Sequence, residues 1–244
     1  MTSAFDGLLE TARTDANILA FWLDGSRGKG LATEHSDFDC TMIVRDDVVA
    51  AYRAKYQSRG NNIDCRVMTL DAFRRHAEWD SPQRYDRYNF AHLIALVDKT
   101  AEAQPLIEEK GRVPPERVAG FIDASLDHAI NQIYRAMKCL RDANPTAARI
   151  EAAEAVAPML DALFALNDGR LRPYYKYLEW ELQHPLTKSP WRADEVPQRL
   201  TALLDPASHI VLRETLMALE TLFRANRHGA VFDAWADALD WMKN

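Results

Sequence analysis

Strand-length apolar runs and stretches of helical spacing alternate along the first part of the chain. Residues Ala4–Thr14 have helical spacing, and Ile18–Leu23 is a continuous apolar run that ends at Asp24. Phe38–Val44 and Ile63–Thr69 have the length and the composition of two further strands. The pattern therefore predicts a small β-sheet whose strands are joined by helices and turns.

The segments that link these strands carry helix and turn signals. Helical spacing covers 48–58 and 70–79 and starts again at Arg87. Residues 92–97 form one more apolar run, which fits either a last strand or the end of a helix. Three residues of turn-forming type precede the third strand, namely Gly60, Asn61 and Asn62. We expect these segments to complete a short mixed sheet.

The second half of the chain has a purely helical pattern. Helical spacing recurs in four segments, 118–142, 146–167, 208–226 and 231–242. Pro114 and Pro115 precede them and disfavour helix in the residue before each proline. We therefore expect an α+β fold with two domains. Residues 1–112 would form a small mixed β-sheet with flanking helices, and residues 113–244 would form an all-α helical bundle.

Composition and charge fit an ordinary globular protein and argue against some classes of binding partner. Hydrophobic residues make up 48% of the chain, and no apolar run approaches the ~20 residues of a membrane-spanning helix. The first residues are acidic where an export signal is basic, so we expect a cytoplasmic protein that binds no membrane. A net charge of −6 argues against binding nucleic acid in bulk, because neutralising phosphates needs a basic face. A homodimer is compatible with the sequence.

The cysteines indicate neither a disulfide framework nor a zinc site. Cys40, Cys65 and Cys139 are odd in number and lack Cys-x-x-Cys spacing. Cys40 and Cys65 alternate with acids along predicted strands, so they point to the opposite face of the sheet from those acids. We expect all three cysteines to be buried free thiols.

A glycine-rich loop joins the first two predicted strands and has the residue types of a phosphate-binding turn. Gly25, Gly28 and Gly30 permit backbone conformations and close approaches that a side chain would block. Backbone amides of such a loop, together with the Ser26 hydroxyl, can hold phosphate oxygens. The loop also contains two basic residues that add positive charge nearby, Arg27 and Lys29.

Two carboxylates follow this loop on one face of the second predicted strand. Because side chains alternate along a strand, Asp37 and Asp39 point to the same face at about 7 Å spacing. Carboxylates that face one way repel each other unless a cation lies between them. Magnesium suits such a place, since it prefers oxygen ligands and is commonly held by carboxylates and substrate phosphates. The pair therefore predicts a magnesium site beside the glycine-rich loop.

The order of strand, Gly-Ser, about ten residues and Asp-x-Asp is a specific motif. With Gly-Ser at 25–26 and Asp-x-Asp at 37–39, the chain resembles the DNA polymerase β-like nucleotidyltransferase superfamily. A Walker A loop is excluded, since Leu31 follows Gly30 where that motif has lysine. Within the superfamily the chain is most similar to the antibiotic nucleotidyltransferases that act on aminoglycosides and lincosamides. The resemblance covers roughly residues 15–70.

The resemblance implies a role for each motif residue. Gly25 and Ser26 would grip the triphosphate of a nucleoside triphosphate, and Asp37 and Asp39 would coordinate two magnesium ions. The superfamily places a third acid on a neighbouring strand, and Asp64 fits that position. Asp64 would then ligate metal and help to remove the proton of the acceptor hydroxyl. A solvated or ion-paired strand residue is the alternative interpretation of Asp64.

Two further sites have alternative interpretations. The resemblance suggests that residues 170–182 of the helical domain form a wall of the acceptor cleft, with Tyr174, Tyr175 and Lys176 binding the acceptor. The aromatic residues of this segment, which also include Tyr177 and Trp180, have helical spacing and could instead pack in a core, and we favour that interpretation. Asp86 is either an alternative proton acceptor or a solvated acid at the start of a helix.

The resemblance implies a reaction but leaves its acceptor open. A nucleoside monophosphate, with AMP expected, would be transferred to a hydroxyl of a small acceptor, and pyrophosphate would be released. An aminoglycoside-like or lincosamide-like acceptor is expected, which would make the chain similar to antibiotic-resistance enzymes. An antitoxin-like nucleotidyltransferase that modifies a protein partner is the second hypothesis, and a nucleotide-binding module without turnover is the third.

Overall fold

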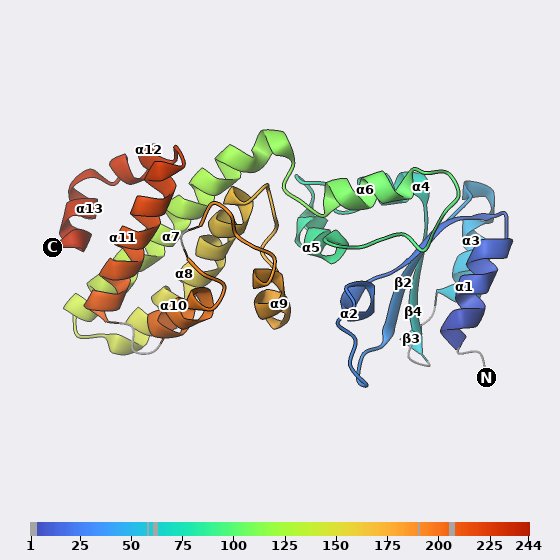
Figure 1. Cartoon of the computed structure of the whole chain (residues 1–244), viewed down its shortest axis with the longest axis horizontal. Helices are drawn as coiled ribbons and strands as arrows, with labels where there is room; N and C mark the ends of the chain where they lie inside the picture. The colour runs from blue at the N-terminus through green and yellow to red at the C-terminus, as the bar shows by residue number, and fades with distance from the viewer. Residues whose placement is uncertain (1–3, 58, 61–62, 190, 205–207) are drawn as a thin grey trace. The chain divides into compact units, whose positions relative to one another are not determined.

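The computed structural model has the α+β fold that the sequence predicts, and it divides into two compact units. The units are Met1–Pro114 and Pro115–Asn244. The structure describes residues 4–57, 59–60, 63–189, 191–204 and 208–244. The expected turn residues Asn61 and Asn62 lie outside these ranges. Figure 1 labels the elements of both units.

A mixed sheet of five strands, in the order β3-β4-β2-β1-β5, forms the centre of the first unit. Its strands are β1 (Ile18–Leu23), β2 (Phe38–Val44), β3 (Arg59–Gly60), β4 (Ile63–Thr69) and β5 (Val97–Asp98). β2 and β4 are parallel, and the other neighbouring strands are antiparallel. The three strands predicted before residue 70 are confirmed. The run 92–97, which the sequence left open between a strand and the end of a helix, contributes only its last residue, Val97, to β5.

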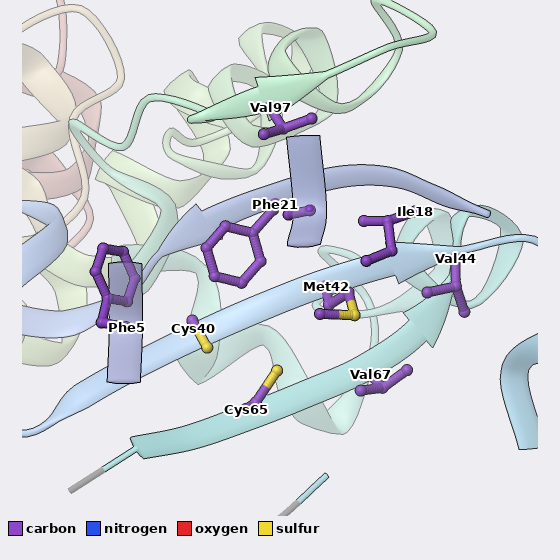
Figure 2. Close-up of a cluster of buried hydrophobic side chains, with 10 residues drawn as sticks. Phe5, Ile18, Phe21, Cys40, Met42, Val44, Cys65, Val67 and Val97 are labelled. Atoms are coloured by element: carbon purple, nitrogen blue, oxygen red, sulfur yellow. The ribbon is translucent and has the colours of Figure 1, made fainter. Parts of the chain in front are cut away.

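Helices cover both faces of this sheet and enclose a hydrophobic layer on each side (Figure 1). α1 (Ala4–Thr14) and α3 (Val49–Tyr56) pack on one face. Figure 2 shows this layer, in which Phe5 from α1 lies beside Phe21 of β1 and Met42 lies farther along β2. The other face is covered by α4 (Leu70–Arg75), α5 (Arg87–Phe90) and α6 (Ala103–Lys110).

The helix expected over 70–79 ends earlier than its apolar spacing indicated. α4 stops at Arg75, His76 is extended, and Ala77 has a φ of 54°. The chain then forms a short 3-10 helix, Pro82–Asp86, before α5 begins. This reversal brings His76 and Asp86 to the same side of β4, where they contact each other.

The second unit consists of helices among its described residues. They are α7 (Val118–Arg141), α8 (Pro145–Leu166), α9 (Leu178–Leu182), α10 (Glu195–Leu204), α11 (His209–Ala225), α12 (Gly229–Asp233) and α13 (Ala236–Lys243). Short 3-10 helices lie at Pro115–Arg117 and Tyr175–Tyr177 in this unit, and another lies at Asp46–Val48 in the first unit. The helices predicted at 118–142, 146–167 and 208–226 are confirmed, whereas 231–242 is two helices rather than one.

α7 and α8 are the longest helices of this unit and pack against each other. Asn144 begins α8, because its side-chain oxygen accepts the Ala147 amide at 3.2 Å, and Pro145 follows at the first helical position. Their facing sides carry buried alanines such as Ala129 and Ala152, which allow close approach. Within the described part of the chain, no helix has both the length and the apolar character needed to cross a membrane.

Candidate active site

Two glycines shape the loop that follows β1. Residues Gly25–Gly28 form the short helix α2, and Gly25 has a φ of +58°. A Cβ on Gly25 would lie 3.0 Å from Oδ2 of Asp39, and a Cβ on Gly28 would lie 2.2 Å from the Leu23 carbonyl oxygen. Only glycine therefore fits at Gly28, and the backbone at Gly25 lies directly beside the Asp39 carboxylate.

Three carboxylates stand in a row across three neighbouring strands. Asp39 on β2 is in register with Asp64 on β4. On the other side of β2, the antiparallel pairing with β1 continues to Asp24, whose amide donates to the Asp39 carbonyl oxygen at 2.8 Å. Residues opposite each other in a sheet project to the same face. The face of the sheet that α4, α5 and α6 cover therefore carries all three carboxyl groups at one end.

These carboxylates line a cavity within the first unit. Its volume is about 520 Å³, which is within the range of small-ligand sites. The described residues that line it are Asp24, Gly25, Asp39, Cys40, Gln57, Asp64, Cys65, Arg66, Asn89 and Phe90. The structure thus brings together Gly25, Asp39 and Asp64, which the sequence predicted as site residues, and adds neighbours that it did not predict.

Asp24 is held in one orientation by two side-chain donors. Trp22 Nε1 donates to its Oδ1 at 2.9 Å, and Thr41 Oγ1 donates to its Oδ2 at 2.6 Å. Burial raises the pKa of Asp24, and the nearby Asp39 charge adds to that effect, while the two hydrogen bonds and Arg66 oppose it. A carboxylate at this place therefore carries an electrostatic cost that positive charge in the cavity would relieve.

Asp37 occupies a different environment from Asp39. It is exposed, precedes β2, and is not among the described residues that line the cavity. Its carbonyl oxygen accepts Nε of Arg27 at 2.9 Å, and the Arg27 guanidinium lies 3.7 Å from the centre of the Phe38 ring. Ser26 Oγ donates to Ser36 Oγ at 3.3 Å. Arg27 and Ser26 therefore hold the loop to the start of β2, and their roles toward nucleotide, like that of Asp37 toward metal, stay predictions.

Lys29 is buried and binds backbone rather than facing the cavity. Its ammonium donates to the carbonyl oxygens of Tyr88 and Asn89 at 3.3 and 3.2 Å, and also to that of Ala91. Tyr88 and Asn89 belong to α5 and Ala91 directly follows it, so the ammonium binds carbonyl oxygens at the C-terminal end of this helix. The side chain is 7% exposed. Lys29 therefore joins the glycine-rich loop to the end of α5.

The positive charge that lines the cavity comes from β4. Arg66 lies two residues after Asp64, and its Nη1 is 3.1 Å from Nε2 of His76. Oδ2 of Asp86 lies 3.4 Å from the same nitrogen, and Asn89 Nδ2 donates to Oδ1 of Asp86 at 3.4 Å. Burial lowers the pKa of His76, and the Arg66 charge lowers it further. Asp86 is not among the described lining residues, so this geometry gives it a supporting position behind Arg66 and Asn89.

Cys40 and Cys65 are in register on β2 and β4, next to the two acids. Their sulfur atoms point toward each other in the hydrophobic layer on the opposite face (Figure 2). A hydrogen bond with Cys65 and burial raise the pKa of Cys40, so this thiol stays protonated. The expectation of buried free thiols is met for these two, while Cys139 is half-buried.

The acceptor-binding residues predicted in the helical unit divide between surface and core. Tyr174, Tyr175 and Lys176 are exposed, whereas Tyr177 is buried. Tyr175 and Lys176 line a shallow cavity of about 440 Å³ together with Glu179. The prediction of core packing is thus wrong for Tyr174 and Tyr175 and confirmed for Tyr177. The acceptor-binding role stays a prediction.

Three of the lining residues that sequence reasoning did not assign to the site escaped it for different reasons. Asp24 was read only as the end of a strand, although its position directly before Gly25 places it beside the site. Arg66 shares a strand face with Asp64, so strand alternation would have found it. Asn89 lies on a short helix far along the chain, and no spacing pattern connects it with the acids.

Comparisons with known proteins give similarity to solved structures but no match by sequence. No family model matches the chain, and no curated protein matches its sequence. A crystal structure of a nucleotidyltransferase-like protein from Exiguobacterium sibiricum 255-15 is similar, with a TM-score of 0.41 and 12% sequence identity. The similarity covers 89% of this chain and 78% of that one. At this level it carries no argument about activity, which has to come from the residues of the cavity.

Proposed function

We propose that this chain is a magnesium-dependent nucleotidyltransferase. It transfers a nucleoside monophosphate, with AMP expected, from a nucleoside triphosphate to a hydroxyl of a small acceptor. The observation that carries this proposal is the register of Asp39 and Asp64 on adjacent strands, at the wall of a cavity that Gly25 and Arg66 also line. The Gly-Ser and Asp-x-Asp motif supports it.

The donor atoms of the cavity fit a magnesium ion. Carboxylate oxygens are the ligands that magnesium prefers, and a site of this kind usually holds it with one or two carboxylates and substrate phosphates. Asp39 and Asp64 would hold the metal, and Asp37 would join them as the motif implies. When bound, the metal offsets the negative charge that gathers on the phosphates during transfer.

The residues of the chain have separate tasks in this reaction. Gly25 itself adds no side chain to the cavity wall, so phosphate oxygens can approach its backbone, and the Arg66 guanidinium supplies a planar donor for them. Asp64 takes the proton of the acceptor hydroxyl. The acceptor oxygen then forms a bond to the α-phosphorus, the bond from that phosphorus to the bridging oxygen breaks, and pyrophosphate leaves with the electron pair.

The acceptor is proposed to be a small polyhydroxylated molecule of the aminoglycoside or lincosamide kind. The helical unit supports this with an aromatic ring, an ammonium and a carboxylate around one shallow cavity, supplied by Tyr175, Lys176 and Glu179. Aromatic faces pack on sugar rings, and a carboxylate pairs with amino groups. Tyr175→Ala is expected to raise the KM for the acceptor while leaving nucleotide affinity unchanged.

Transfer from labelled nucleoside triphosphates tests the activity. The wild type is incubated with each α-phosphate-labelled triphosphate, magnesium and a panel of aminoglycosides, lincosamides and cell extract, and products are identified by mass. Asp39→Asn is expected to lower transfer by on the order of 10² or more, because a metal ligand is lost. Asp46→Asn, an exposed acid at a 3-10 helix, is the control and should keep full activity. A labelled protein rather than a small molecule would replace the proposed acceptor with a protein.

A further inference from the structure

A hydrogen bond to His76 holds the Arg66 guanidinium at the wall of the cavity. Arg66 is exposed, and its Nη1 lies 3.1 Å from Nε2 of His76. Because guanidinium nitrogens only donate, the imidazole nitrogen is the acceptor. Among the residues that the structure describes, no second acceptor binds this guanidinium. An arginine side chain loses much conformational entropy when a ligand fixes it, so His76 decides whether the guanidinium is already in place when a phosphate enters.

The His76 ring is itself fixed by its surroundings. The backbone next to it is held by the buried Arg87 side chain, whose Nη1 donates to the Ala77 carbonyl oxygen at 3.0 Å. The ring packs edge-on against Phe90, with 5.9 Å between the ring centres, and the His76 side chain is 17% exposed. A ring that is held in this way offers its Nε2 at one place, which a positioning contact requires.

Nε2 of His76 lies between a cation and an anion. Arg66 Nη1 is 3.1 Å away from it, and Asp86 Oδ2 is 3.4 Å away. A protonated Nε2 would donate to Asp86 and could not accept from Arg66, whereas a neutral ring with its proton on Nδ1 can accept. Burial lowers the pKa of His76, the charges of Arg66 and Lys110 lower it further and that of Asp86 opposes them, so the ring is neutral near pH 7. The shorter contact, to Arg66, then indicates that Nε2 carries no proton.

We propose that His76 is a positioning residue for the transfer reaction, whose unprotonated Nε2 holds the Arg66 guanidinium where it meets the phosphates of the nucleoside triphosphate. The inference rests on the proposed function, because it assumes that Arg66 binds phosphate. A guanidinium has several donors, so one hydrogen bond to His76 leaves others for phosphate oxygens. In this assignment His76 acts through Arg66 and not on the substrate itself.

A double-mutant cycle on ATP affinity tests the assignment. Calorimetry of the full chain with magnesium near pH 8, where the ring is neutral, compares the wild type, His76→Phe, Arg66→Ala and the double variant. His76→Phe keeps a ring and removes the acceptor, and is expected to weaken ATP binding about fivefold, the usual effect of one hydrogen bond. In the Arg66→Ala background the same change should alter affinity by less than about 1.5-fold, because the two residues act as one unit. His76→Gln keeps an acceptor oxygen and should bind within about twofold of the wild type. His128→Phe, at an exposed histidine of α7, is the control and should bind as the wild type does.

The tautomer of His76 is a second readout, which a merely structural role would not fix. Nitrogen-15 spectra of the imidazole distinguish a protonated ring nitrogen from an unprotonated one. The chain has 7 histidines, and the His76 signals are those that are missing from His76→Gln. We expect the proton on Nδ1 and none on Nε2. A proton on Nε2 would overturn the inference, since the ring would then donate to Asp86 and could not hold Arg66.

The outcomes separate this inference from the proposed function. If the wild type does not bind ATP, or Arg66→Ala binds it equally well, the nucleotide site of the proposed function is wrong, and the role of His76 is wrong with it. If Arg66→Ala weakens binding and folded His76→Phe stays within about 1.5-fold of the wild type, the proposed function stands and His76 does not position Arg66. An equal loss from His76→Phe in both backgrounds, or a His76→Gln that binds as weakly as His76→Phe, also overturns the inference. Melting temperatures show which variants are folded, and if His76→Phe is not, the tautomer in the wild type decides.

Discussion

Replacing Lys29 by methionine separates a structural role from a role in nucleotide binding. Methionine keeps most of the apolar stem and removes the ammonium, so the carbonyl oxygens of Tyr88, Asn89 and Ala91 lose their charged donor. A hydrogen bond to a charged group contributes roughly 1.5–3 kcal/mol net. Burying an ammonium costs several kcal/mol and offsets part of the total for three bonds. We expect Lys29→Met to lower the free energy of unfolding of the first unit by about 2–4 kcal/mol.

The measurement has to report on the first unit alone, because two units can unfold separately. Hydrogen exchange in increasing urea, followed by mass spectrometry of peptides from the first unit, gives its free energy of unfolding. Lys99→Met is the matched control, since the Lys99 ammonium is exposed and donates to one carbonyl oxygen, that of Asp15, at 2.7 Å. Its expected effect is under about 1 kcal/mol.

Nucleotide affinity completes the test. The structure predicts that folded Lys29→Met binds nucleoside triphosphate within about threefold of the wild type, because the ammonium does not line the cavity among the described residues. The sequence prediction of a phosphate contact expects a loss of tenfold or more instead, equal to about 1.4 kcal/mol. Unchanged stability together with lost affinity would refute the structural reasoning.

Further predictions concern the cavity and the loop. Arg66→Ala should weaken triphosphate binding at least about tenfold, measured by calorimetry, because a charge-assisted contact is lost. Asp64→Asn should lower turnover by on the order of 10² to 10⁴ and, because it also removes a proposed metal ligand, should weaken magnesium binding; turnover within about twofold of the wild type would exclude both roles. Gly28→Ala should fail to fold or melt well below the wild type, since its Cβ meets the Leu23 carbonyl oxygen. The pKa of His76 is lowered by burial and by Arg66, so the folded protein should lose stability as pH falls below about 6.5, and His76→Gln should lose less over the same range.

Local signals in the sequence were enough for the three central strands and for part of the site. The side on which Asp39 lies followed from alternation along its strand, which depends only on the backbone, whereas Asp64 was assigned because the resemblance implies a third acid on a neighbouring strand. The neighbourhood of Lys29 did not follow, because the carbonyls that it binds are 59 to 62 residues away. A lysine in a glycine-rich loop has the same appearance whether it faces a phosphate or the end of a helix.

Asp86 and Asn89 are further residues whose neighbours in the structure could not be predicted from the sequence. The contact of Asp86 with His76 depends on where α4 ends, and the left-handed conformation at Ala77 ended it before the apolar spacing did. Pairing between β1 and β2 depends on strand order, which periodicity does not give. Asp24 therefore became a neighbour of Asp39 only once that pairing was known.

The strands β2 and β4 carry the same dipeptide, Asp-Cys, at matching positions, Asp39–Cys40 and Asp64–Cys65. If either strand shifted by one residue relative to the faces of the sheet, its carboxylate would enter the hydrophobic layer and its thiol would take the place of a ligand. Burying an unpaired carboxylate costs several kcal/mol, which is a large share of the stability of a domain of this size. A chain that folds with β2 or β4 out of register therefore loses stability, and it loses it at the residues that the proposed chemistry needs. Correct folding and a correctly built site are selected together.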